Sequence, residues 1–237
     1  MKRILVSLLT CLFFSAPVIF SLEPSGGNLC ALDLRDSDTL VENQILYKGR
    51  IWRNLYRRIE GDQYFVTDAF MTGSVSIEGK RFDNVPLKYD IFFDEIITTT
   101  NKDIIIVLNK EMIDSFTVSY LNKVHHFKSI KEDSSRLVSG YVDILYNGNV
   151  SLYVKYMKKI DPVSALKEYD NFYQAHKIYL DNKGSISLIN KKKDILRIFE
   201  NQKQQIKDYI RKNKLRIRKE IPESFVAVVE FCNTLEN

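Results

Sequence analysis

Residues 142–156 read VDILYNGNVSLYVKY, two runs of alternating side chains on either side of Asn147-Gly148. An Asn-Gly pair between alternating runs is typical of a β-hairpin, because both central residues of a type I′ turn need a positive φ angle. The sequence therefore predicts two antiparallel strands here, joined by a type I′ turn at Asn147-Gly148.

The same alternation extends along the chain in both directions. It recurs in Val85, Leu87, Tyr89, Ile91 and Phe93, in Ile104, Ile106 and Leu108, and in Phe116, Val118 and Tyr120. Turn residues fall at 78–80, 101–103 and 181–184, and such short links favour antiparallel neighbours because parallel strands need long crossovers. We therefore expect a mainly β (α+β) fold over residues 46–190. It is an antiparallel meander sheet, in the form of a sandwich or a partly open barrel, with Leu87, Tyr89 and Ile91 facing its core.

After Lys193 the apolar spacing becomes helical, and residues 191–237 are predicted to be a C-terminal helical part of the same domain. One helix is expected from Asp194, as the N-cap, to about Lys212, with Lys203, Lys207 and Arg211 pointing outward. Its apolar stripe comprises Ile195, Leu196, Phe199, Ile206, Tyr209 and Ile210. A second helix is expected from Pro222 to about Leu235, and a shorter one after Asp161-Pro162, through Ala165, Leu166 and Tyr169.

The N-terminus has the pattern of an export signal. Lys2 and Arg3 precede a charge-free run over residues 4–22, in which Ser15, Ala16 and Ser21 offer small residues for cleavage. We predict a cleaved signal peptide over residues 1–22 and a leader segment over 23–45. The expected location is the periplasm or the outer membrane surface, otherwise outside the cell. Two alternatives remain: an uncleaved membrane anchor, or a lipid-modified cysteine at Cys30 or Cys11.

The charge is unevenly distributed. The whole chain has a formal net charge of +5, yet residues 191–219 hold twelve Lys or Arg against three Asp or Glu. We interpret this stretch, Lys191–Lys219, as a solvated helix face, with contact to an anionic membrane surface as the alternative. Exposed aromatic residues interleaved for base stacking are missing, so no nucleic-acid partner is expected.

Several motifs resemble a family of uncharacterised exported proteins common in Bacteroidota. They are residues 47–52 (YKGRIW), 73–75 (GSV), 87–91 (LKYDI), 94–97 (DEII), 108–111 (LNKE) with Ser115-Phe116, and the Lys/Ile-rich helix before the last one. The resemblance implies residence in the envelope of such a bacterium. It implies no activity, cofactor or site residue.

Residues that carry chemistry are few. His125 and His126 are adjacent, so on a strand they point to opposite faces, and His176 stands apart. An oxidising compartment would permit a disulfide between Cys30 and Cys232, but Cys232 is better interpreted as a small buried apolar residue. The acids Asp90, Asp94 and Glu95 lie close together, with Asp90 and Asp94 on one face. A carboxylate pair could serve glycoside hydrolysis, but we interpret Asp90 and Asp94 as solvated surface acids opposite the apolar face. The sequence predicts no catalytic, cofactor-binding or metal-binding residue, no cofactor and no enzyme activity.

Two classes of function remain. One is an exported, non-catalytic envelope protein that binds a partner protein or assembles, since tyrosine is frequent at interfaces. The alternative is a periplasmic carrier of a lipid or another apolar small molecule inside a curved sheet. Its cavity would be lined by Phe65, Phe70, Phe92, Phe93, Phe116 and Phe127. The residues of an apolar ligand site or an interface are not indicated.

Overall fold

The computed structural model describes residues 44–131, 137–162 and 169–235, which belong to one unit, Leu40–Asn237. Within these ranges, eleven strands form one open sheet in the order β1-β5-β4-β3-β2-β6-β7-β8-β9-β10-β11, and every neighbouring pair is antiparallel. The strands are β1 (Gly49–Ile51), β2 (Met71–Ile77), β3 (Lys80–Asp90), β4 (Glu95–Thr99), β5 (Ile105–Leu108), β6 (Ile113–Tyr120), β7 (Lys123–Ile130), β8 (Gly140–Tyr146), β9 (Val150–Asp161), β10 (Asn171–Asn182) and β11 (Ser185–Ile189). The predicted antiparallel meander is confirmed.

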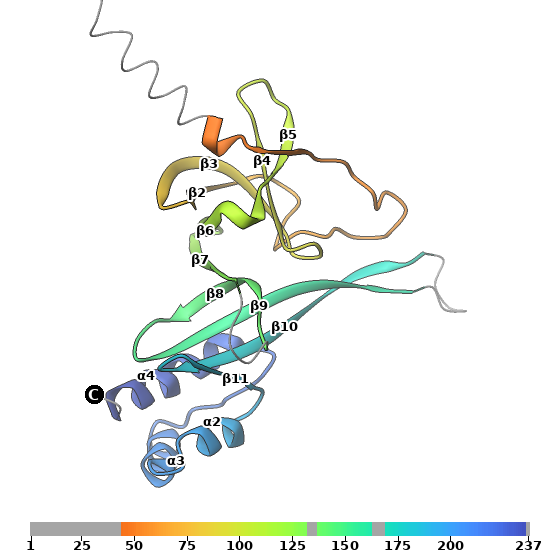
Figure 1. The fold of residues 1–237 in the computed structure, drawn as a ribbon. Helices are drawn as coiled ribbons and strands as arrows, with labels where there is room; N and C mark the ends of the chain where they lie inside the picture. The colour runs from red at the N-terminus through yellow and green to blue at the C-terminus, as the bar shows by residue number, and fades with distance from the viewer. Residues whose placement is uncertain (1–43, 132–136, 163–168, 236–237) are drawn as a thin grey trace, which may run out of the picture. The chain divides into compact units, whose positions relative to one another are not determined.

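The sheet consists of two meanders joined side by side. Strands β2 to β5 form the first and β6 to β11 the second, and the pairing of β2 with β6 unites them. A short 3-10 helix, η1 (Lys110–Met112), leads from β5 into β6, and the Asn109 side chain accepts a hydrogen bond from the backbone N–H of Glu111. The long pair β9 and β10 stands out in Figure 1.

Four hairpin links occur where turn residues were expected, including the link between β4 and β5 at residues 101–103. Glu78-Gly79 and Lys183-Gly184 each have two consecutive positive φ angles, which type I′ turns require. The predicted hairpin at Asn147-Gly148 is also present, but the predicted turn type is wrong, because neither residue has a positive φ.

A residue from far along the chain lies against this link. The side chain of Asn233 accepts a hydrogen bond from Val150 N at 3.0 Å, and a Cβ on Gly148 would lie 2.6 Å from the same side-chain oxygen. The link between β8 and β9 is three residues long, whereas a type I′ turn belongs to a two-residue link, and the register shifts between Ile144 and Tyr146.

A first core lies on one face of strands β2 to β9. Leu87, Tyr89 and Ile91 are buried in it, as predicted. Across the sheet they meet residues that the register places on the same face, including Phe116, which pairs with Phe127. The expected strand alternation therefore holds through the end of β3.

A second core forms where the C-terminal helices pack on β9, β10 and β11 (Figure 1). The helices are α2 (Lys192–Ile198), α3 (Lys203–Lys212), the 3-10 helix η2 (Pro222–Phe225) and α4 (Val226–Leu235). Ile195, Phe199, Ile206 and Ile210 are buried against Val150, Leu152, Ile178 and Leu180, so the predicted stripe is confirmed. Cys232 is fully buried in the same core, as expected.

The prediction of a single helix from Asp194 to Lys212 is wrong, because two helices, α2 and α3, occupy this stretch. Phe199 is the C-cap of α2, and its ψ of 59° takes the backbone out of the helix and separates α2 from α3. The Phe199 side chain is buried in the second core. Asp194 is also not the N-cap. That position is Lys191, and the Asp194 carboxylate accepts hydrogen bonds from the backbone N–H groups of Asn190 and Lys191.

Some predictions fall outside the described residues. They are the signal peptide over 1–22, most of the leader over 23–45, and the short helix through Ala165 and Leu166. Among the helices that the structure describes, none has the length and apolar character needed to cross a membrane.

Candidate functional site

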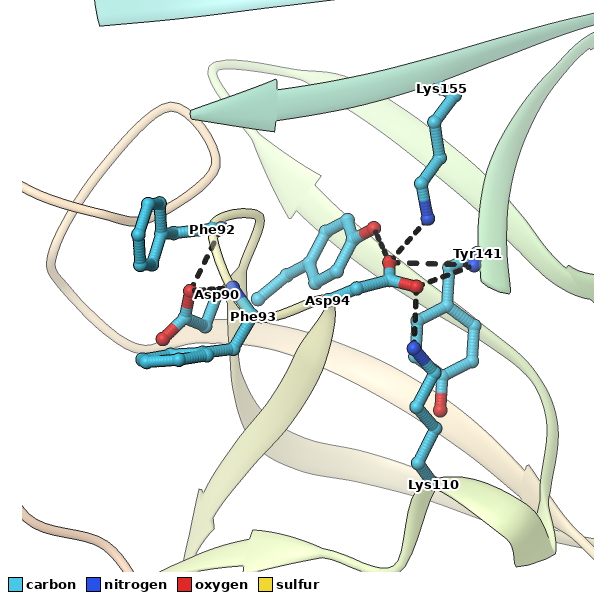
Figure 2. A network of polar contacts seen from close by, with 8 residues as sticks. Asp90, Phe92, Phe93, Asp94, Lys110, Tyr141 and Lys155 are labelled. Carbon is cyan, nitrogen blue, oxygen red and sulfur yellow. Dashed lines mark hydrogen bonds and ion pairs between the residues drawn. The ribbon is translucent and has the colours of Figure 1, made fainter. Parts of the chain in front are cut away.

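The four residues Ile91 to Asp94 form the turn between β3 and β4, and an aspartate stands at each end of it. Asp90 is only 1% exposed, and the Asp94 side chain is 17% exposed. The interpretation of both as solvated surface acids on one face is therefore wrong. Alternation stops at Asp90, where β3 ends, and Asp94 has a φ of 60°, so the two carboxylates point into different surroundings (Figure 2).

Asp94 accepts polar contacts from four elements of the fold. The Tyr89 hydroxyl of β3 donates to Oδ1 at 2.6 Å, and Lys110 Nζ of η1 donates to Oδ2 at 2.7 Å. Lys155 Nζ of β9 lies 2.6 Å from Oδ1, and the backbone N–H of Tyr141 in β8 approaches both oxygens at 3.4 Å (Figure 2). This carboxylate therefore ties the β3–β4 turn to β8 and β9.

The positive charges of Lys155 and Lys110 keep the Asp94 carboxyl ionised. Burial alone raises the pKa of a carboxyl, but Lys155, Lys110 and the Tyr89 hydroxyl favour the anion and hold the pKa of Asp94 below its usual value. Burial lowers the pKa of Lys155, and the charge of Lys110 adds to this, while Asp94 opposes it. Burial also raises the pKa of Tyr89 well above its usual value, so its hydroxyl stays a donor.

The chain leaves space for this carboxylate at Gly140. A Cβ at that position would lie 1.8 Å from Asp94 Oδ2, and the residue has a φ of +79°. Both the close approach and the backbone conformation require glycine.

Two open depressions flank the Asp94 network and share Lys110 and Glu111. Their volumes are about 450 and 220 Å³, and the larger is also lined by Lys48 and Arg50. Asp94 lines neither of them. A molecule bound in either depression would therefore face Lys110 and not the carboxylate behind it.

Asp90 has uncharged partners. Its Oδ1 accepts the backbone N–H of Phe92 at 2.9 Å and of Phe93 at 3.0 Å, and its Oδ2 accepts the Gln63 amide. Burial raises the pKa of Asp90 to about 6, although these three hydrogen bonds partly oppose the increase. The carboxylate holds the backbone of the turn at the point where Phe92 and Phe93 leave it (Figure 2).

Four rings gather at this turn, and we call Tyr56, Phe92, Phe93 and Phe172 the aromatic cluster. Tyr56 lies 5.2, 5.7 and 5.8 Å from the ring centroids of Phe92, Phe93 and Phe172. Phe92 lies 5.0 Å from Phe93 and 5.4 Å from Phe172. Phe93 is 41% exposed, so the predicted placement of its side chain on the buried face of β3 is wrong.

The surroundings of the aromatic cluster are rich in arginine and exposed apolar groups. Leu55, directly before Tyr56, is 71% exposed. Arg57, Arg58 and Tyr169 line an open depression of about 580 Å³ together with Ile59 and Glu60. Arginine, tyrosine and phenylalanine are residue types that are enriched at protein interfaces.

The six phenylalanines that were expected to line a cavity are found in three places. Phe65, Phe116 and Phe127 pack on one another in the first core, with the Phe116 and Phe127 rings stacked at 4.6 Å. Phe70 lies against Lys88, and Phe92 and Phe93 belong to the aromatic cluster. These ring contacts do not favour the carrier alternative, which stays a prediction.

The histidines do not come together. His125 is buried with Nδ1 2.6 Å from Asp143 Oδ2, while His126 is exposed on the opposite face, as the adjacent positions predicted. His176 contacts the backbone carbonyl of Lys219. In the part of the chain that the structure describes, no three His, Cys, Asp or Glu side chains are grouped to hold a metal ion.

Comparison with known proteins found no matching family model, no matching curated protein and no matching solved structure. Geometry alone therefore carries the functional argument. Sequence reasoning missed the roles of Asp90 and Asp94 and the partnership of Tyr56 with Phe172. The spacing Asp90-Ile91-Phe92 carried a usable signal, because an aspartate often bonds the backbone N–H two residues on.

Proposed function

We propose that the protein is an exported, non-catalytic envelope protein that binds a partner protein, with the aromatic cluster at the centre of its contact surface. One observation carries the proposal. Phe92 and Phe93 stand on a turn that buried carboxylates hold at both ends, and Phe93 is still 41% exposed.

Holding the Asp90 end of this turn costs the protein free energy, because that carboxyl is buried without a cation beside it and its pKa is raised. A carboxylate in a buried position is unfavourable unless it is paired or hydrogen-bonded, and this turn uses two. A side chain that is already fixed loses little conformational entropy on binding, so a rigid aromatic anchor binds more tightly than a mobile one. The arrangement suits recognition of a partner surface.

Arginine at the edge of the cluster supports a protein partner. Arg57 and Arg58 are exposed beside Tyr169, and guanidinium groups donate to carboxylate and backbone oxygens in fixed geometry. We therefore expect the partner to present an apolar group to Phe93 with acidic or carbonyl oxygens beside it.

The Asp94 network supports a non-catalytic protein. Its carboxylate oxygens are already engaged by Tyr89, Lys110 and Lys155, which leaves them no freedom to act as a base toward a substrate. The network stabilises the fold, and the turn it fixes presents the contact surface.

The test is site-specific photo-crosslinking in cells that export the protein. A photoreactive phenylalanine analogue replaces Phe93, and a matched control carries it at Ile104, which is 46% exposed on another turn. We expect one adduct of defined mass at position 93, which is lost when Phe172→Ser removes a neighbouring ring. If position 93 gives no adduct, or the same adducts as position 104, the proposal is overturned.

A further inference from the structure

The stretch Lys191–Lys219 forms a second surface, separate in sequence from the aromatic cluster, and we call it the basic surface. It comprises α2, α3 and the segment that follows α3. All twelve of its cationic residues are exposed: Lys191, Lys192, Lys193, Arg197, Lys203, Lys207, Arg211, Lys212, Lys214, Arg216, Arg218 and Lys219.

Few of these charges are neutralised within the fold. Arg211 pairs with Asp208 at 2.7 Å, and Arg197 lies 3.8 Å from Asp194. Across the described ranges, no ion pair joins the other ten cations to an acid. The positive field of the basic surface is therefore directed outward.

The charge pattern on α3 works against the helix itself. Lys203, Lys207 and Arg211 follow one another at intervals of four residues, so like charges stand side by side on one helix face. Lys203 also occupies the first turn, where the helix dipole disfavours a cation. The buried face of α3 is formed by Ile206 and Ile210, and among the described residues Lys203 and Lys207 add no ion pair to it. Only Arg211 is favourably placed, in the last turn and beside Asp208.

The side chains of the basic surface favour an anionic bilayer over a nucleic acid as its partner. Tyr209 is stacked on Phe231 at 4.0 Å, so the aromatic ring of α3 is occupied inside the fold and does not offer a platform for a base. A laterally extended sheet of negative charge, with no need for stacking, matches exposed lysines and arginines better.

We propose that the basic surface binds the headgroups of an anionic lipid bilayer and orients the protein with α2 and α3 toward the membrane. The rest of the chain is net negative by comparison, because the segment holds nine excess positive charges and the whole chain only five. An anionic bilayer therefore attracts this segment more strongly than the rest of the chain. This contact is independent of the aromatic cluster.

The test is vesicle flotation of the full chain at low and at high salt. One set of vesicles mixes phosphatidylglycerol with phosphatidylcholine, and the other is phosphatidylcholine alone. The test variant is Lys203→Gln with Lys207→Gln and Arg211→Gln. The control variant is Lys102→Gln with Lys131→Gln and Lys177→Gln, which removes the same charge from exposed sites elsewhere.

We expect salt-sensitive binding to the anionic vesicles only, weakened on the order of tenfold or more by the test variant and little by the control variant. Both variants keep the native N-terminus, so they differ only in which three charges are removed. Equal losses in the two variants would overturn the proposal. So would equal binding to neutral vesicles, or stronger binding to a single-stranded oligonucleotide than to the anionic vesicles.

Discussion

Asp90 and Asp94 stand four residues apart at the two ends of one turn, yet their surroundings differ in one decisive respect. Asp94 faces two lysines, whereas Asp90 faces an amide and two backbone N–H groups. Burial acts on both carboxyls in the same direction, but only the lysines outweigh it. The pKa of Asp94 is consequently lowered and that of Asp90 is raised to about 6.

The comparison teaches that burial alone does not decide the state of a carboxyl group. Neutral donors stabilise an anion, but a nearby cation contributes more at short range. One end of the turn is therefore a permanent ion pair, and the other end titrates near neutrality. The two ends should respond differently to mutation and to pH.

The largest effect is expected from Asp94→Asn. The change leaves Lys155 buried without a counter-charge, and breaking a buried pair from one side costs about 3 to 5 kcal/mol. Urea unfolding at neutral pH measures the loss. Adding Lys155→Met should recover part of it, because the unpaired charge is then removed. A loss no larger than that of Asp90→Asn would remove the distinction between the two ends.

Gly140→Ala should come next, at about 2 to 4 kcal/mol, because a side chain at positive φ adds strain to a clash in a packed site. The new Cβ would lie 1.8 Å from Asp94 Oδ2 and 2.8 Å from Lys155 Nζ. Gly79→Ala is the control, since Gly79 has a φ of +79° as well but nothing within 4 Å of its Cβ position. Equal losses at the two glycines would mean that backbone strain alone acts, without a contact to Asp94.

The third effect concerns pH. The folded pKa of Asp90 lies above its usual value of 3.8, so the folded state binds the proton more tightly than the unfolded chain does. Asp90 therefore destabilises the fold above about pH 6, and this loss is relieved as the pH falls from about 6 to about 4. The expected gain is on the order of 2 kcal/mol relative to Asp90→Asn, which lacks the titrating group.

The contribution of Asp94 to the pH dependence of stability has the opposite sign. Its pKa is lowered, so its stabilising contribution is present above the unfolded pKa and is lost as the pH falls through the lower folded pKa. Unfolding curves at several pH values between 4 and 7 test Asp90 while Asp94 stays ionised. A wild-type slope that is unchanged in Asp90→Asn would contradict the assignment.

The smallest effect is expected from Lys110→Gln. The Lys110 side chain is 39% exposed, so water replaces much of the lost contact with Asp94, and the cost should be about 1 kcal/mol or less. Urea unfolding compares it with Lys155→Gln, whose side chain is 14% exposed and whose loss should be clearly larger. Equal costs would indicate that Lys110 shares the charge of Asp94 evenly with Lys155.

The sheet was predictable because its information is local. Alternation in Leu87 and Tyr89 reports which side chains share a face, and Glu78-Gly79 reports a turn by its backbone preferences. The same local logic failed at Phe93 and Asp94. The prediction extended the alternation of the strand from Ile91 to Phe93. In the structure, the Asp90 side chain accepts hydrogen bonds from the backbone of Phe92 and Phe93, and the chain turns there.

The candidate site was not predictable in the same way, because its partners are scattered through the sequence. Lys110 and Lys155 reach Asp94 from positions 16 and 61 residues further along the chain, and Tyr56 meets Phe172 from opposite ends of the sheet region. Nothing in the neighbourhood of any one of these residues indicates the others. The break at Phe199 is a similar case, since packing on the sheet overrides the helical period.

The contact between Asn233 and the β8–β9 link has a consequence for how the chain reaches its final form. It joins residues 83 positions apart, and it comes from the last helix that the structure describes. Contacts of such long sequence separation slow folding, since a large loop must close before they form. The link around Gly148 therefore gains this hydrogen bond only once α4 has docked beside it. Closure of the second core therefore depends on α4, which contributes Val228, Val229 and Cys232 to it and is the last element to be made of those that the structure describes.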